Sequence, residues 1–266
     1  MKIQFWNIIL LSFIIMSCEY RDPIGPYPNS INEKSYIQGF LELNWMHGSP
    51  TSGIKVNKTE NSINLRYRNF DESKIYDIKD GVGISLTIGK ERSPEEITWD
   101  NNIEHYNELT KKIGDISYNS RIMSGVIHSD RIIAIADTLQ SVNIICDKSI
   151  DENHPAGSNL NDIFSVYFED PYAVIKNGYQ SVTGSNYYSL DRETIPEGFP
   201  YALFGSKLSA IDFSVKPYIG TEWYLVLETA PENTDEYTFT ISITDMQGKT
   251  IEKKARAPIK IKGSKG

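Results

Sequence analysis

The feature that most constrains the fold of this chain is a strict alternation of apolar and polar residues near its C-terminal end. In EYTFTISITD, the apolar side chains Tyr237, Phe239, Ile241 and Ile243 alternate with threonine and serine. Successive side chains of a β-strand point to opposite faces, so the pattern predicts a strand with one buried face. The turn-forming DMQGKT around Gly248 and the returning IEKKARAPIKIK predict an antiparallel neighbour.

The same alternation recurs over much of the chain and predicts a mainly β protein. It is present in SINLRYRNF (62–70) and VGISLTIG (82–89), and two isoleucine-rich runs, RIIAIAD (131–137) and SVNIICD (141–147), predict central strands. Strands separated by turns in this way are typical of an antiparallel β-sandwich, and we expect one of the immunoglobulin-like type. Asp235-Glu236-Tyr237 resembles the tyrosine corner of such domains.

One segment departs from the alternation and predicts a single short helix at residues 102–113. Ile103, Tyr106, Leu109 and Ile113 have the spacing of one helix face. The segment ends with two lysines and a glycine, which is a common way for a helix to end.

The first residues have the three parts of a secretory signal peptide. Lys2 is followed by an almost wholly apolar run and by the small residue Ser17. A membrane-spanning helix needs about 20 apolar residues, and this run is shorter. The sequence therefore predicts a signal peptide over residues 1–17.

The end of that segment, Ile15-Met16-Ser17-Cys18, resembles a bacterial lipobox. By this resemblance Cys18 becomes the first residue of the mature protein and carries a diacylglycerol thioether and an acyl chain such as palmitate, which would anchor the protein to a membrane. A plain signal peptide with an incidental cysteine and an uncleaved anchor remain the alternatives. Asp after the cysteine is the inner-membrane retention signal of enterobacteria, so the Glu19 found here favours the outer membrane.

The rest of the chain divides into a tether and a body. Residues 18–34 contain the lipidated cysteine and three closely spaced prolines, which favour extended backbone, and we expect a tether there. Residues 35–262 form the predicted β-rich body. A division of that body into two subdomains near residues 120–140 remains open.

Composition and motifs exclude several classes of function. The net charge of −8, with no cluster of Lys or Arg, argues against nucleic acid as a partner. Neither a nucleophile elbow, a zinc-protease helix motif nor a phosphate-binding glycine loop is present in the sequence. We therefore expect no cofactor and name no catalytic residue. Cys146, in an apolar run, is expected to be a buried thiol without a partner if Cys18 is lipidated.

The stretch DKSIDENHPAGSNLNDIF contains the weak candidates for a metal site, Asp147, Asp151 and Asp162. A calcium loop that starts at Asp147 would need glycine at its sixth position and an acid at its twelfth. Glu152 and Ser158 stand there instead. We therefore expect no metal, and interpret the stretch as a connection whose side chains hydrogen-bond their own backbone.

Tyrosines are concentrated between residues 170 and 205, and Tyr179, Tyr187, Tyr188 and Tyr201 are the candidates for a ligand-binding surface. Exposed aromatic rings beside amide side chains suit a glycan or a protein partner. The alternative is that these rings pack the loop onto the core.

Three segments together resemble lipoproteins of Bacteroides-type gut bacteria (Bacteroidota), a group to which we attach no activity. They are the lipobox ending at Cys18, DENHPAGSNLNDIF (151–164) and VKPYIGTEWYLVLETAP (215–231). The resemblance implies an exported protein, lipid-anchored at the outer membrane, with a β-rich domain of unknown function. Asp137-Thr138-Leu139 also resembles the O-glycosylation signal of Bacteroidota exported proteins, with Thr138 as acceptor.

We therefore expect a membrane-anchored lipoprotein that is more a binding or surface-complex protein than an enzyme. Its ligand would be a glycan or another envelope protein. The alternative is a hydrolase that acts on glycans or peptides.

Overall fold

The computed structural model describes residues 35–64, 68–69, 71, 73–89, 103–118, 132–190, 199–254 and 259–263. The chain divides into two compact units, residues 1–31 and residues 32–266, and all described residues belong to the second. The predicted signal peptide, Cys18 and the tether lie outside the described residues. In the part of the chain that is described, no helix has the length and apolar character needed to cross a membrane.

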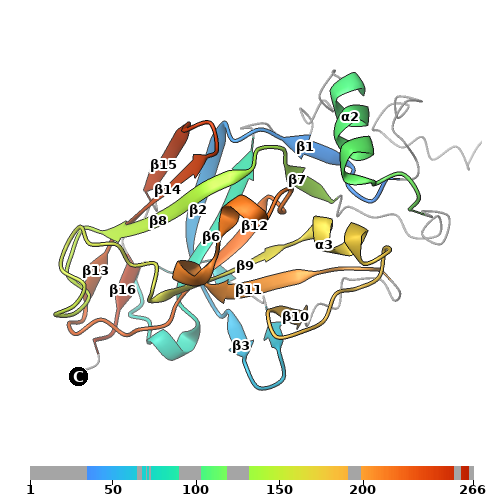
Figure 1. Cartoon of the computed structure of the whole chain (residues 1–266). Helices are drawn as coiled ribbons and strands as arrows, with labels where there is room; N and C mark the ends of the chain where they lie inside the picture. The colour runs from blue at the N-terminus through green and yellow to red at the C-terminus, as the bar shows by residue number, and fades with distance from the viewer. Residues whose placement is uncertain are drawn as a thin grey trace, which may run out of the picture. The chain divides into compact units, whose positions relative to one another are not determined.

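The described body is mainly β, as the alternation predicted, and its largest element is a curled sheet of nine strands (Figure 1). In spatial order these are β3 (Lys55–Asn57), β4 (Ser62–Asn64), β10 (Tyr187–Leu190), β11 (Leu203–Lys207), β9 (Phe164–Glu169), β12 (Glu222–Leu227), β6 (Gly83–Gly89), β2 (Trp45–Ser52) and β5 (Arg68–Asn69). Neighbours are antiparallel except β4 and β10, which are parallel. Strands from both sides of residues 119–131 thus join one sheet.

Three smaller sheets complete the described β-structure. One has the order β15 (Thr250–Lys254), β14 (Phe239–Asp245), β8 (Leu139–Cys146), with antiparallel pairing. The others pair β1 (Gly39–Leu41) with β7 (Ile133–Ile135) in parallel and β13 (Asp235–Tyr237) with β16 (Ile259–Ile261) antiparallel.

The main hydrophobic core contains side chains from both the three-stranded and the nine-stranded sheets. The alternation in β14 holds, because Phe239, Ile241 and Ile243 are buried while Thr240 and Ser242 between them are half-buried. Phe239 meets Phe164 of β9 edge to face, with 5.4 Å between ring centroids. The hydroxyl of Tyr237 donates to the carbonyl of Asn233 (2.7 Å), a hydrogen bond of the kind a tyrosine corner makes.

An aromatic row crosses four neighbouring strands of the large sheet. It consists of Tyr187, Phe204, Phe168 and Trp223, which are aligned by the strand register. Successive ring centroids are 5.6, 5.3 and 5.2 Å apart, within the range of favourable aromatic pairs. The indole of Trp223 is fully buried, and its Nε1 donates to the carbonyl of Gly220.

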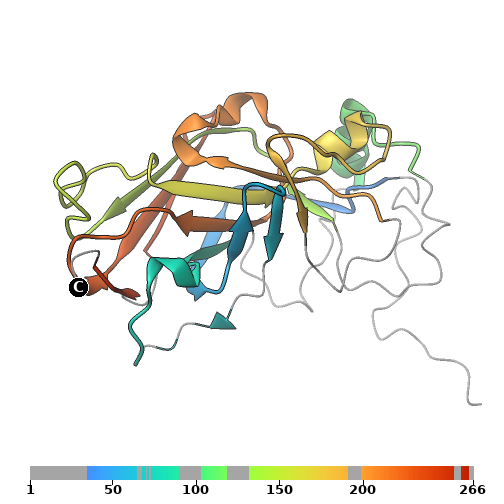
Figure 2. The same ribbon diagram turned by 90° about the horizontal axis from the view of Figure 1, so that it is seen from below.

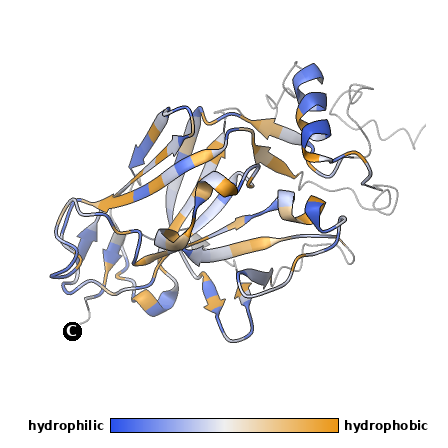
Figure 3. Ribbon diagram, viewed as in Figure 1, coloured by the Kyte–Doolittle hydropathy of each residue, from blue (hydrophilic) through white to orange (hydrophobic). Residues whose placement is uncertain are grey.

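The opposite face of the same strands carries a second, smaller core. Tyr167, Tyr224 and Val226 lie there, because alternate side chains of β9 and β12 point away from the aromatic row. Figure 2 shows the β3–β4 hairpin, in blue, below β9 on this side. The hairpin contributes Ile63 to this core, and Figure 3 shows how apolar and polar residues alternate along the strands.

The predicted helix at residues 102–113 is confirmed as α2 (Ile103–Ile113). Leu109 and Ile113 pack in a third apolar cluster. Directly after the helix, the buried carboxylate of Asp115 accepts hydrogen bonds from the backbone N–H groups of Tyr36 (2.7 Å) and Ile37 (2.8 Å). Burial raises the pKa of Asp115 although these hydrogen bonds oppose the shift.

A second helix, α3 (Pro171–Lys176), was not predicted. The signals for it are present in the sequence, since Asp170 caps its first turn and a proline occupies the first position. Six residues are too few to show helical periodicity. The described residues also form three short 3-10 turns, η1 (Ile78–Asp80), η4 (Leu208–Ala210) and η5 (Phe213–Val215).

Two expectations about strand arrangement change. The immunoglobulin-like sandwich is not confirmed, since nine strands form one curled sheet. The prediction of central strands is wrong, because among the described strands β7 pairs with β1 alone, apart from one bridge between Ala134 and Gly220, and β8 is an edge strand. An apolar run indicates burial, and here the edge of β8 is covered by a loop whose Leu160 N–H donates to the carbonyl of Ile144.

Cys146 at the end of β8 is a buried free thiol, and burial raises its pKa to about 11.

Gly205 leaves the space that the second core needs. A Cβ atom on this residue would lie 2.4 Å from the ring of Tyr167 and 2.8 Å from the ring of Tyr188. We predict that Gly205→Ala lowers the free energy of unfolding by about 1–3 kcal/mol, because a packed core resists an added methyl group. Urea unfolding measures this. Gly48→Ala is the control, since its Cβ would lie no closer than 3.1 Å to any other side chain. Equal losses in both variants would contradict the packing argument.

Candidate functional site

A hollow of about 480 Å³ opens beside the first residue of β10, and we call it the Tyr187 hollow. Its size falls in the range of small-molecule sites. It lies where β10 and β11 face the segment that contains η4 and η5. The lining residues are Thr183–Tyr187, Phe204, Ala210–Asp212, Val215 and Lys216.

Local hydrogen bonds fix the two walls of this hollow. On one wall, the N–H of Tyr187 donates to the carbonyl of Gly184, which closes a tight turn before β10. Gly184 has φ +154°, a conformation that favours glycine. On the other wall, the carboxylate of Asp212 accepts from both the backbone N–H and the hydroxyl of Ser214, which caps η5.

Lys216 lies against the Tyr187–Phe204 end of the aromatic row. Its Nζ lies 3.7 Å from the ring centroid of Phe204 and 5.8 Å from that of Tyr187, so the ammonium makes cation–π contacts. The same Nζ donates to the Oδ2 of Asp170 at 3.1 Å. The side chain of Lys216 is 20% exposed and that of Asp170 only 7%, so the ion pair is largely shielded from solvent.

Asp170 ties the hollow to α3. Its Oδ2 also accepts from the hydroxyl of Tyr187 (3.0 Å), and its Oδ1 accepts from the N–H of Ala173. Burial, and then the charge of Asp170, raise the pKa of Tyr187, so its hydroxyl stays a donor at neutral pH. The carboxylate of Asp170 thus positions Tyr187 and Lys216 and also caps α3.

The resulting surface combines an aromatic ring, a fixed ammonium group, and the amide and hydroxyl groups of Asn186, Thr183 and Ser185. Such a combination offers an apolar face together with hydrogen-bond donors and acceptors. This arrangement suits a small polar ligand with an apolar side, such as a sugar ring.

The structure does not bring the four candidate tyrosines together in one surface. Tyr187 lines the hollow, whereas Tyr188 is buried edge-on against Tyr167, 5.2 Å away. Neighbouring residues of a strand point to opposite faces, so these two could not share a surface. Tyr179 lies against Tyr118, and the hydroxyl of Tyr201 accepts from the N–H of Leu190.

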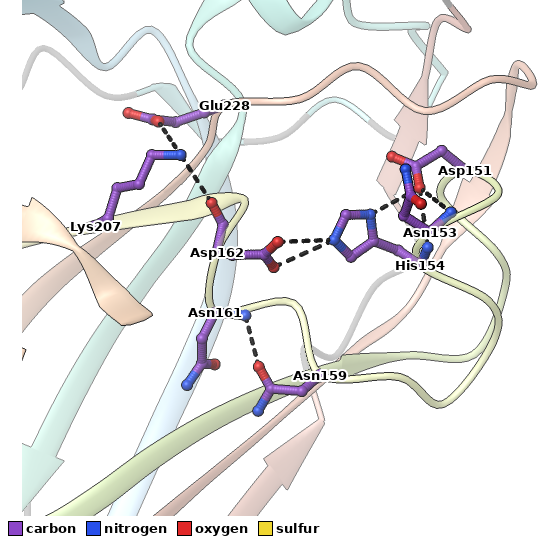
Figure 4. Close-up of polar contacts among 8 residues, drawn as sticks. All are labelled: Asp151, Asn153, His154, Asn159, Asn161, Asp162, Lys207 and Glu228. Atoms are coloured by element: carbon purple, nitrogen blue, oxygen red, sulfur yellow. Dashed lines mark hydrogen bonds and ion pairs between the residues drawn. The ribbon is translucent and has the colours of Figure 1, made fainter. Parts of the chain in front are cut away.

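The stretch that held the weak metal candidates forms a polar cluster around His154, shown in Figure 4. The Nδ1 of His154 lies 2.7 Å from the Oδ1 of Asp151, and its Nε2 lies 3.1 Å from the Oδ2 of Asp162. Asp151 also accepts from the backbone N–H groups of Asn153 and His154 itself. The imidazole thus joins the start of the connection to its end.

Asp147 lies apart from this cluster, and its Oδ1 accepts from the N–H of Thr238. Within the described ranges, no group of three or more His, Cys, Asp or Glu residues is placed to hold a metal ion. The predicted backbone hydrogen bonding is present, because Asn159 and Asp151 both accept from N–H groups of the same connection.

Burial disfavours the charged form of His154, but hydrogen bonds to Asp162 and Asp151 outweigh it and raise the pKa of the imidazole. With both nitrogens facing carboxylates, the protonated ring donates twice. The protonated form therefore stabilises the folded connection.

Thr138, the candidate for glycosylation, lies between β7 and β8 and is half-buried. Its carbonyl accepts from the N–H of Met246, while the carboxylate of Asp137 accepts from the N–H of Leu43. Cys18, the candidate for lipidation, lies outside the described residues.

Sequence reasoning missed Asp170, Phe204 and Lys216 as members of the hollow. Asp170 carried a signal, since an Asp-Pro pair marks a helix start. Nothing in the sequence indicates that Phe204 and Lys216 meet, because their contact depends on how the η5 segment folds over the sheet.

Comparison with known protein families, with curated proteins and with solved structures finds no match for this chain.

The His154 cluster gives a pH-dependent prediction. Because the folded pKa is raised, the stabilisation is fully present below the ordinary histidine pKa of about 6.5 and is lost as pH rises through the raised value. We expect His154→Gln to lose about 1 kcal/mol of unfolding free energy at acidic pH, a figure that allows for the exposure of Asp162. This difference should shrink toward alkaline pH.

Urea unfolding between about pH 5.5 and about pH 9 checks this. His105→Gln, which removes an exposed histidine from α2, is the matched control. A wild-type advantage that stays constant or grows with pH would contradict the account of His154.

Proposed function

We propose that this protein is an exported lipoprotein of the bacterial outer membrane, and that its body binds a glycan in the Tyr187 hollow without catalysing a reaction. The observation that supports the binding role is the hollow of about 480 Å³ in which Tyr187 and Lys216 are fixed by Asp170. Fixed side chains lose little conformational entropy on binding, which favours recognition.

A glycan fits the chemistry of the lining better than a purely apolar ligand. Sugar rings have an apolar face that can lie on an aromatic ring, and their hydroxyls bond to amides and carboxylates. Asn186 and Asp212 supply such groups on opposite walls. The carboxylate of Asp170 is already bonded to Tyr187, Lys216 and the backbone, which supports binding rather than hydrolysis.

The proposed setting comes from the sequence. The lipobox-like segment ending at Cys18 and the proline-rich residues after it support an anchored body held away from the membrane by a tether. We further propose that the body is a modified β-sandwich, since Phe239 of the three-stranded sheet packs on Phe164 of the large sheet.

Binding at the hollow predicts a selective effect of Tyr187→Ala. On a glycan array, the purified protein should bind a defined set of glycans, and the variant should bind them at least roughly tenfold more weakly, because it loses the ring that the sugar contacts. Tyr172→Ala, which removes a half-buried ring from α3 outside the lining, is the control. Equal binding by wild type and Tyr187→Ala, or no glycan bound at all, would refute the proposal.

Anchoring predicts that Cys18→Ala abolishes incorporation of labelled palmitate in the producing bacterium, because the thioether forms on that sulfur. Cys146→Ala is the matched control and should keep the label, since Cys146 is buried in β8. If the Cys18→Ala protein still incorporated labelled palmitate, the lipobox prediction would be wrong.

A further inference from the structure

A second cavity lies on the other face of the large sheet, away from the Tyr187 hollow. It has a volume of about 480 Å³ and is bounded by β3, by η1 and by the outward side chains of β9 and β12. Tyr167 and Val226, members of the second core, form part of its lining. We call it the lysine cavity, after Lys55, Lys58 and Lys79.

The charge of this lining is opposite to that of the whole protein. The lining contains three lysines and one acidic residue, Glu228, whereas the chain carries a net charge of −8. Lys58 pairs with Glu228 at 2.6 Å. Among the described residues, neither Lys55 nor Lys79 makes an ion pair, so two positive charges in the lining have no carboxylate partner there.

Glu228 is itself held in place, so it does not compensate those two charges. Its Oε1 also accepts from the hydroxyl of Ser165 at 2.7 Å, and Lys207 lies 3.9 Å from its Oε2. Figure 4 shows Lys207 between Glu228 and the carbonyl of Asp162. Burial works against ionisation of Glu228, but the hydrogen bonds of Lys58 and Ser165 lower its pKa.

The wall that carries Lys79 is built rigidly against the start of β3. Gly81, with φ +69°, ends η1, and a Cβ atom there would lie 1.9 Å from the carbonyl oxygen of Ile54. The N–H of Gly53 donates to the carbonyl of Asp80 across the same contact, and the carboxylate of Asp77 accepts from the N–H of Lys79. The backbones that carry Lys55 and Lys79 are thus held side by side.

We propose that the lysine cavity binds a phosphate monoester that carries a short apolar group. The phosphate lies between Lys55 and Lys79, and the apolar group lies against Val56 and Ile78, the half-buried apolar side chains of the lining. A phosphate monoester has between one and two negative charges near neutral pH, which matches two ammonium groups that have no carboxylate partner among the described residues. Lysine binds phosphate as a point charge and needs no fixed planar geometry.

The test compares three probes by titration calorimetry with the full protein. Hexyl phosphate has both parts of the expected ligand, inorganic phosphate has only the anion, and hexyltrimethylammonium has a similar apolar chain with a positive head. We expect hexyl phosphate to bind most tightly, and its affinity to fall as salt is added. Equal binding of the cationic probe, or no binding of hexyl phosphate, would overturn the proposal. Tight binding of inorganic phosphate alone would overturn the assigned role of Val56 and Ile78.

Two double variants test where hexyl phosphate binds. Lys55→Gln/Lys79→Gln should weaken hexyl phosphate roughly tenfold, because two charge contacts are lost. Lys111→Gln/Lys112→Gln changes the net charge equally at exposed positions of α2 and should leave the affinity unchanged. An equal loss in both double variants would show a general charge effect and refute the site. All four lysines are exposed, so we expect both variants to fold, which thermal unfolding checks.

Discussion

The aromatic row across β10, β11, β9 and β12 is the packing interaction on which the rest of this structure depends. It places four rings in one register, with Phe168 between Phe204 and the fully buried Trp223. Phe213 of η5 stacks on Trp223 with only 5° between the ring planes, which brings the η5 segment onto the sheet. Because Lys216 follows directly, the same packing carries its ammonium to Phe204 and Asp170.

Because side chains alternate along each strand, each face of the large sheet carries its own core and its own cavity. Residues that point with the aromatic row form the main core and end at the Tyr187 hollow. The residues between them, such as Tyr167 and Val226, form the second core and the floor of the lysine cavity. One set of strands therefore positions two cavities of different chemistry, an aromatic and polar one and a basic one.

Much of the local structure could be predicted from the sequence, and little of the arrangement. The period-two pattern of β14 and the helical spacing of Tyr106, Leu109 and Ile113 are local signals, and both elements form as predicted. The place of β8 at a sheet edge, and the meeting of Lys216 with Phe204, depend on contacts between residues far apart in the chain. Tyr187 could be predicted as a candidate binding residue from the tyrosine-rich sequence around it. That Tyr187 and Tyr188 point to opposite faces could be deduced only once strand β10 was known.

Hydrogen exchange tests the central role of the aromatic row most directly. If the row is the most stable part of the fold, amides of β9 and β12 exchange only through global unfolding. Phe168→Leu should then lower their exchange free energy by the same amount as the free energy of unfolding measured in urea. Exchange of β9 and β12 through a smaller local opening, while β8 and β14 stay protected, would contradict the account.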